Sequence, residues 1–191
     1  MDRDRRSLSA GFKYVIAGGI ASALLLLGTA FLYRLTGTLN IDGMIEAGAA
    51  GSQGALAAMP AGMAALFLVL AAVLIELKPF PANGWALDVY ETTQPGIAAV
   101  LSIGTSTAML AGLYKLLPLF SQSMLTVLAG VGFLTFIGSN LVGLRQEHAR
   151  RLLGYSSVAH VGLIIGALAL LEHFSAPTST RALVAGGLFL N

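Results

Sequence analysis

The chain has 191 residues, of which 56% are hydrophobic and only 10% are charged. Soluble domains carry roughly 25% charged residues, so this composition predicts an integral membrane protein in a lipid bilayer. The sequence has no cysteine, which excludes disulfides, thiolate catalysis and cysteine-based metal sites. The formal net charge of +2 lies on loops and the amino terminus, and it indicates membrane orientation rather than nucleic-acid binding.

Uncharged runs along the chain predict an all-α fold, a polytopic bundle of transmembrane helices that forms a single region over 1–191. A spanning helix needs about 20 apolar residues. Complete helices are expected at 14–33, 57–78, 94–115, 123–143 and 152–171. A sixth apolar stretch begins at residue 182 and has about half the length of a span, so we expect the chain to be a fragment of a larger protein.

The distribution of positive charge predicts the orientation of these helices, because loops that stay in the cytoplasm retain Lys and Arg. One side collects eight of these residues and the other collects three, which predicts a cytoplasmic amino terminus. The eight are Arg3, Arg5, Arg6, Lys13, Lys78, Arg145, Arg150 and Arg151, and the three are Arg34, Lys115 and Arg181.

The second predicted helix ends in an unusual way, with Glu76 and Lys78 followed at once by Pro79 and Pro81. Two prolines separated by one residue cannot continue a helical hydrogen-bond ladder. One interpretation is that the helix terminates here and its charges reach the headgroups, with Trp85 anchoring a surface loop. The other is a broken helix around Pro79–Pro81, which resumes within 85–90 and leaves both charges inside the protein.

Three ionisable residues are candidates for a proton pathway: Glu76, Lys78 and His160. Ionisable groups are costly to place inside a membrane, so we take each one there as a candidate functional residue. A buried Lys readily exchanges its proton with a neighbouring acid. His160 lies about nine residues into the fifth helix, and its ordinary pKa suits a proton relay. The alternative for His160 is a packed side chain that is hydrogen-bonded to Ser156 one turn earlier.

Other chemistries find no support in the sequence. The glycine-rich stretches lack the Lys-Ser/Thr of a phosphate loop, and Glu147-His148 is an isolated pair without metal-ligand spacing. Ser156, Ser157 and His160 share one helix with no acid, so no catalytic triad is expected. We therefore expect no cofactor, no metal site and no catalytic redox chemistry in this chain.

Three segments carry a resemblance to a known family. The stretch 81–95, with Trp85 and Asp88-Val89-Tyr90, is similar to the loop after the broken helix in the antiporter-like membrane subunits of respiratory complex I. The stretch 150–162 and the opening 6–14 resemble two further signatures of the same subunits. The chain thus resembles the chain N (subunit 2) type of the proton-translocating NADH:quinone oxidoreductase/Mrp antiporter transmembrane family, of which it looks like a central fragment.

The resemblance implies a proton channel built on a Glu–Lys pair and further Lys and His residues. The Glu of that pair belongs to a helix before residue 1. The Lys of the broken helix falls on Glu76, and the Lys of the next helix falls near Ser106, so neither position carries the family's cation.

The resemblance also implies a function and partners. It indicates a membrane-arm subunit, in the cell inner (plasma) membrane, of an NADH:quinone oxidoreductase-type translocase. Partner membrane subunits would then surround it, and redox reactions in other subunits would drive proton translocation. The alternatives are a subunit of a cation/proton antiporter or of a membrane-bound hydrogenase, and a truncated structural subunit that conducts no protons.

Overall fold

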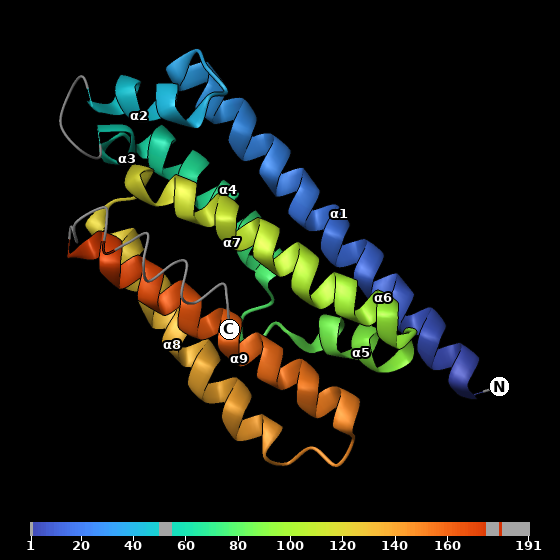
Figure 1. The fold of residues 1–191 in the computed structure, drawn as a ribbon. Coiled ribbons are helices and arrows are strands. Elements are labelled where there is room, and N and C mark those ends of the chain that lie inside the picture. The colour runs from blue at the N-terminus through green and yellow to red at the C-terminus, as the bar shows by residue number, and fades with distance from the viewer. Residues whose placement is uncertain (1, 50–54, 175–179, 181–191) are drawn as a thin grey trace.

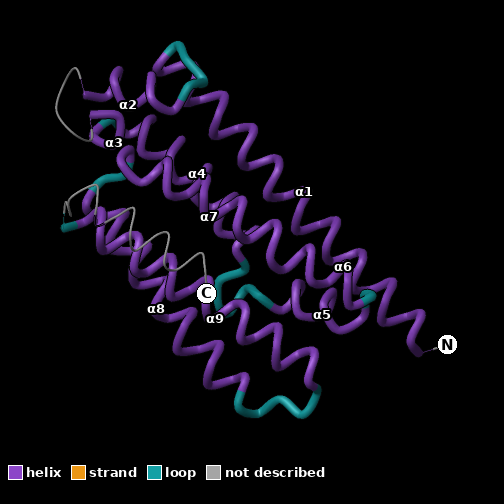
Figure 2. Tube along the Cα trace, viewed as in Figure 1, coloured by secondary structure: helices purple, strands orange, loops and turns teal. Residues whose placement is uncertain are grey.

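Helices account for nearly all of the secondary structure in the computed structural model, which describes residues 2–49, 55–174 and 180. In these ranges 87% of the chain is helical and no strand is present, which confirms the predicted all-α bundle. Figures 1 and 2 show long helices that run side by side along one axis. A helix satisfies its own backbone hydrogen bonds, so it is the natural element of an apolar chain in a bilayer.

Five helical stretches within the described residues are long and apolar enough to cross a membrane, and each overlaps one of the expected spans. The apolar stretch expected from residue 182 lies outside the described residues. In chain order the elements are α1 (Asp2–Thr36), α2 (Ile41–Ala49), α3 (Ala55–Ala58), α4 (Pro60–Leu77), α5 (Gly84–Thr92), α6 (Pro95–Ala99), a π-helical turn (Val100–Gly104), α7 (Thr105–Leu116), a 3₁₀ turn (Leu117–Leu119), α8 (Gln122–Gly143) and α9 (Ala149–His173).

The longest element is α1, whose 35 residues correspond to a length of about 50 Å. The hydrocarbon core of a bilayer is only about 30 Å thick, so α1 extends beyond it. Figure 1 shows α1 along one side of the molecule, next to α4 and α5. Gly28 allows a close approach between α1 and α4, because a Cβ atom there would lie 2.7 Å from Val69 Cγ2 and 3.0 Å from the Ala65 carbonyl oxygen.

The helices α8 and α9 form an antiparallel hairpin with the most extensive contact of any helix pair in the described residues. Glycines line the contact between them. A Cβ atom on Gly132 would lie 2.4 Å from the Gly166 nitrogen and 2.7 Å from the Gly162 oxygen. Small residues let membrane helices approach closely and gain dispersion energy, so these positions hold the hairpin together.

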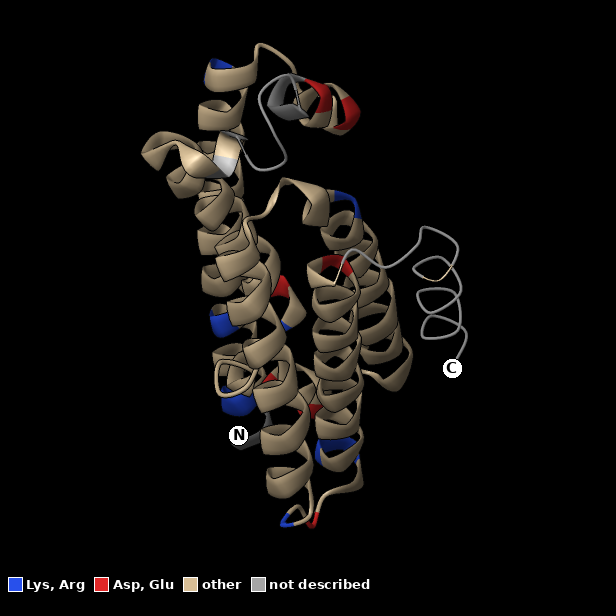
Figure 3. Cartoon of the chain, turned by 90° about the vertical axis from the view of Figure 1, so that its left-hand side faces the viewer, with Lys and Arg blue, Asp and Glu red and all other residues tan. Residues whose placement is uncertain are grey.

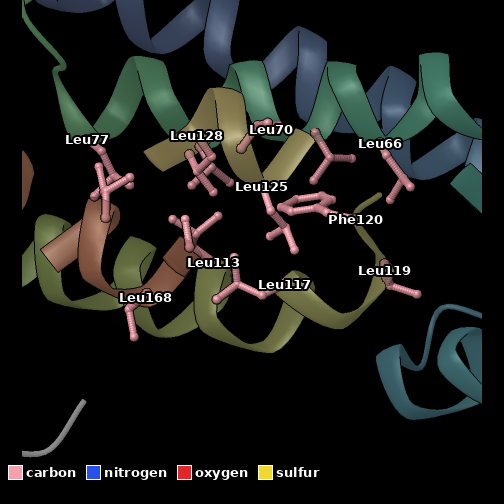
Figure 4. Close-up of a cluster of buried hydrophobic side chains, with 14 of the residues drawn as sticks. Leu66, Leu70, Leu77, Leu113, Leu117, Leu119, Phe120, Leu125, Leu128 and Leu168 are labelled. Carbon is pink, nitrogen blue, oxygen red and sulfur yellow. The ribbon is translucent and has the colours of Figure 1, made fainter. Parts of the chain in front are cut away.

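A leucine-rich core joins the hairpin to the rest of the bundle. Figure 4 shows side chains from α4, α7, α8 and α9 pointing toward one another, and Leu77, Leu113 and Leu168 are almost completely buried. The charged residues gather mainly toward the two ends of the bundle, as Figure 3 shows. Polar groups near the middle are therefore the exceptions that need an explanation.

Replacing Gly132 by Ala should destabilise the α8–α9 hairpin by about 1–3 kcal/mol, because the added methyl group meets backbone atoms that cannot swing aside. The measurement is the melting temperature of the detergent-solubilised protein. Gly130→Ala is the matched control on the same helix, since a Cβ atom there meets nothing within 4 Å. Equal melting temperatures for the two variants would contradict the close contact at Gly132.

Candidate functional site

The helix break is centred on Lys78, which follows the last residue of α4 in a left-handed conformation (φ 58°, ψ 51°). Its amide donates hydrogen bonds to the carbonyl oxygens of Leu74 (2.9 Å) and Ile75 (3.3 Å), which closes the end of the helix. Pro79 has no amide hydrogen and cannot extend the ladder. Helical structure resumes at Gly84, so the broken helix around Pro79–Pro81 is confirmed.

The segment between α4 and α5 is fastened to α8. The amide of Phe80 donates to Thr135 Oγ1 at 3.2 Å, and the Thr135 hydroxyl donates in turn to the Val131 carbonyl oxygen at 2.7 Å. The ring of Phe80 lies against Gly138, where a Cβ atom would come within 2.6 Å of it. Pro81 is exposed, but these contacts hold the break against the bundle and make it a fixed part of the fold.

The side chain of Lys78 turns into the bundle and is only 4% exposed. Its Nζ atom lies 3.3 Å from Thr105 Oγ1 and 3.2 Å from Ser106 Oγ, and 5.7 Å from the centroid of the Tyr90 ring. Two neutral hydroxyls and an aromatic face thus surround the ammonium group. Within the described part of the chain, no ion pair within 4 Å includes Lys78, which is unusual for a buried cation.

The two hydroxyls come from the start of α7, directly after the π-helical turn Val100–Gly104. A π turn inserts one extra residue into a helix and rotates the residues after it, and such turns are frequent at functional sites. Here Thr105 also donates to the Leu101 carbonyl oxygen, which leaves its oxygen lone pairs facing the Lys78 ammonium. The π turn therefore sets the orientation of both hydroxyls.

Glu76 and Lys78 line the same cavity, together with Tyr14, Trp85 and Tyr90. Residues two apart on a regular helix point to different sides, so the left-handed turn at Lys78 is what brings the two together. The cavity has a volume of about 10 Å³, close to the minimum that holds one water molecule. Glu76 is half-buried, on the side of α4 that faces Gly18 of α1.

The structure places His160 elsewhere. Its side chain is exposed on α9, and its Nδ1 atom lies 2.8 Å from the carbonyl oxygen of Ser156, one turn earlier. It does not line the cavity that Glu76 and Lys78 share. Among the residues that the structure describes, no group of three His, Asp or Glu side chains could hold a metal ion.

A cluster of ion pairs that the sequence analysis did not single out lies beside the break. Asp88 of α5 pairs with Lys13 of α1 (2.5 Å) and with Arg151 of α9 (3.5 Å). Glu91, one turn further along α5, pairs with Arg151 at 3.0 Å. Asp88 and Glu91 are three residues apart, which places them on one face of a helix. This spacing is the feature of the sequence that could have predicted a shared cationic partner.

These features define a class of protein, a polytopic membrane protein with a discontinuous helix around a buried lysine. The comparisons with known proteins then name the family. The family model described as "NADH:quinone oxidoreductase/Mrp antiporter, TM" matches residues 1–189. The chain belongs to this family, and it is an integral, multi-pass membrane protein.

Individual relatives agree with this assignment. The chain is similar to NADH-quinone oxidoreductase subunit N of Chromohalobacter salexigens, with 37% identity over 186 residues that cover 95% of this chain and 38% of the relative. The corresponding subunit of Desulfovibrio desulfuricans is 38% identical over 175 residues, covering 87% and 34%. The chain thus spans little more than a third of the length of these relatives.

A solved structure has a similar fold. A chain in the structure of the Mrp complex from Dietzia sp. DQ12-45-1b superimposes with a TM-score of 0.74 and 27% sequence identity. The match covers 85% of this chain and 30% of that chain.

Thr135→Val should destabilise the protein by about 1–3 kcal/mol, because the amide of Phe80 then loses its acceptor inside the bundle. Thermal unfolding of the solubilised protein measures the effect. Thr126→Val is the matched control, since Thr126 lies on the same helix and its exposed hydroxyl donates only to the Gln122 carbonyl oxygen. A melting temperature for Thr135→Val equal to that of the control would show that the break does not depend on α8.

Proposed function

We propose that this chain is the central part of a proton-translocating subunit in the membrane arm of a complex-I-like NADH:quinone oxidoreductase. The observation that carries the proposal is the buried ammonium of Lys78 at the helix break, which hydroxyls hold and which has no carboxylate within 4 Å among the residues that the structure describes. The names of the relatives from Chromohalobacter salexigens and Desulfovibrio desulfuricans support it. Redox chemistry belongs to partner subunits, and this chain contributes the path for protons.

The proton step proposed at this site connects Lys78 and Glu76. A buried ammonium and a half-buried carboxylate that share one small cavity can exchange a proton through a single water molecule. The transfer converts two charged groups into two neutral ones, so a change in the nearby electric field shifts it in either direction. Thr105 and Ser106 stabilise the charged form of Lys78, and their hydroxyls accept from it.

The position of the Lys78 ammonium also matters for Glu76 and Ser106, the two positions where the resemblance would place a lysine. Ser106 carries no charge, yet the Lys78 ammonium lies 3.2 Å from its hydroxyl oxygen. A single lysine thus reaches both the break and the position on α7 where the family has its next cation. This supports a conducting subunit over the purely structural alternative.

A second candidate function is cation/proton antiport, and the likeness to a chain of the Dietzia Mrp complex favours it. The two functions differ in what drives the proton. Membrane vesicles that acidify on addition of NADH indicate the oxidoreductase. Vesicles that release a preformed proton gradient only on addition of Na⁺ or K⁺ indicate the antiporter.

We further propose that the amino terminus lies on the cytoplasmic side of a bacterial inner membrane. The distribution of Lys and Arg supports this orientation. With the buried Lys78 left out, seven of these residues are still grouped on one side and three on the other. The contact of Lys13 with Asp88, and of Asp88 with Arg151, agrees with the grouping of Lys13 and Arg151 on one side.

Single cysteines introduced at Gly37 and at Arg145 should be labelled from opposite faces of the membrane by an impermeant maleimide. The cysteine-free chain makes each thiol the only target within it. We expect Cys at position 145 to react from the cytoplasmic face and Cys at position 37 from the other face. Labelling of both from one face would overturn the proposed topology.

Lys78→Met in the intact assembly should lower the protons moved per NADH oxidised, because it removes the group that takes up and releases the proton at this site. The measurement uses inverted membrane vesicles, with dye quenching for protons and absorbance for NADH. Lys115→Met is the matched control, because Lys115 is an exposed lysine in the last turn of α7. An equal ratio in the two variants would refute the role of Lys78.

Glu76→Gln and His160→Ala extend the same measurement. Glu76→Gln should lower the proton ratio with assembly and NADH oxidation by an artificial acceptor unchanged. His160→Ala tests whether this separate, exposed histidine also belongs to the path. A loss of assembled complex with an unchanged ratio would identify either residue as structural.

A further inference from the structure

The short helix α5 has to be held by its surroundings. It has nine residues, and isolated helices of that length are not stable in water. Its apolar side packs against α9, where a Cβ atom on Gly154 would lie 2.7 Å from Leu87 Cδ2 and 3.2 Å from Tyr90 Cδ2. Trp85 at its start contacts the ring of Tyr14 on α1, with ring centroids 5.9 Å apart. These contacts hold α5 against α1 and α9 by packing alone.

Ion pairs add directional contacts between α5 and the same two helices. Asp88 binds Lys13 of α1 with one carboxylate oxygen and Arg151 of α9 with the other. Glu91 binds the same guanidinium, and Arg150 donates to the carbonyl oxygens of Glu91 (3.4 Å) and Thr93 (3.5 Å) at the end of α5. The carboxylate side chains are 26% exposed, while Arg151 is 32% and Lys13 is 51% exposed, so water screens the Arg151 pairs less than the Lys13 pair.

Tyr90 lies between these two carboxylates in the chain, and its ring faces the Lys78 ammonium. It is 8% exposed and touches α9 at Gly154, so the ring has little freedom of its own. Its position over Lys78 therefore follows the position of α5. The residues that fix α5 fix the ring as well.

We propose that Asp88 and Glu91 are positioning residues for proton transfer at Lys78. By binding Lys13 and Arg151 they hold α5 in the register at which the Tyr90 ring covers the ammonium group. This rests on the proposed function, since it assumes that Lys78 carries protons. It also gives the α8–α9 hairpin a direct connection to the site, because a movement of α9 pulls on α5 through Arg151.

The test is a double-mutant cycle in the intact assembly, with the protons moved per NADH oxidised as the readout. One variant removes both charges (Asp88→Asn with Glu91→Gln), one removes the ring (Tyr90→Leu), and one combines all three changes. If the carboxylates act through the ring, each of the first two variants lowers the ratio, because each misplaces or removes the ring beside Lys78. The combined variant is then no worse than Tyr90→Leu alone.

Charge-retaining and ring-retaining controls complete the design. Asp88→Glu and Glu91→Asp keep the charges, so they should lower the ratio less than the neutral variants do. Tyr90→Phe keeps the ring, so it should lower the ratio less than Tyr90→Leu does. The amount of assembled complex and NADH oxidation by an artificial acceptor normalise every value. Where the doubly neutral variant does not assemble, Glu91→Gln alone takes its place in the cycle, because it leaves both ion pairs of Asp88 in place.

Several results would overturn the inference. An unchanged ratio in the neutral variants shows that the ion pairs do not position the site. Effects that multiply in the combined variant show that the carboxylates act independently of Tyr90. Loss of assembly in every neutral variant, but not in the charge-retaining ones, assigns them a structural role only. Failure of the proposed function is seen separately, as a normal ratio in Lys78→Met.

Discussion

The need to satisfy backbone polar groups at the point where α4 ends governs the arrangement of this chain. A helix that stops inside a bundle leaves carbonyl oxygens and amides that water cannot freely reach, and each unsatisfied group costs several kcal/mol. The left-handed Lys78 closes the carbonyl end of α4, and Thr135 accepts the amide of Phe80 beyond it. The same turn that closes the helix also directs the Lys78 side chain inward. The proposed site is thus a consequence of how the break is stabilised.

The environment of Lys78 is polar without being acidic. A carboxylate in direct contact would keep the ammonium permanently charged, whereas hydroxyls and an aromatic ring stabilise it more weakly. The acid, Glu76, lines the same cavity but forms no ion pair within 4 Å among the described residues. An arrangement in which acid and base are neighbours without being bonded suits a reversible transfer better than a tight salt bridge does. This supports a working proton site over a structural charge pair.

Much of the fold was predictable from the sequence, because the requirement for apolar spans is strong and Pro79 and Pro81 break any helix. The site was only partly predictable. Glu76 and Lys78 were recognised as candidates, but their approach depends on a left-handed turn that favours Gly and here occurs at a lysine. The contact with Ser106 depends on the π turn before it, which no local pattern in the sequence indicates. The exposure of His160 depends on which face of α9 packs against α8, and apolar residues occur all around this helix, so the sequence does not reveal that face.

The break is attached to the α8–α9 hairpin in two physically different ways. Before α5, the attachment is a buried hydrogen bond from Phe80 to Thr135 and the packing of its ring on Gly138, both of which depend on short distances. After the start of α5, the attachment is ionic, through Arg151, and charge–charge attraction falls off slowly with distance. A small displacement of the hairpin would therefore weaken the hydrogen bond and the packing at Phe80, while Arg151 would still attract the carboxylates of α5. Lys78 lies two residues before the first attachment, and Tyr90 lies between the two carboxylates of the second, so a displacement of this kind would change the distance between the Lys78 ammonium and the Tyr90 ring.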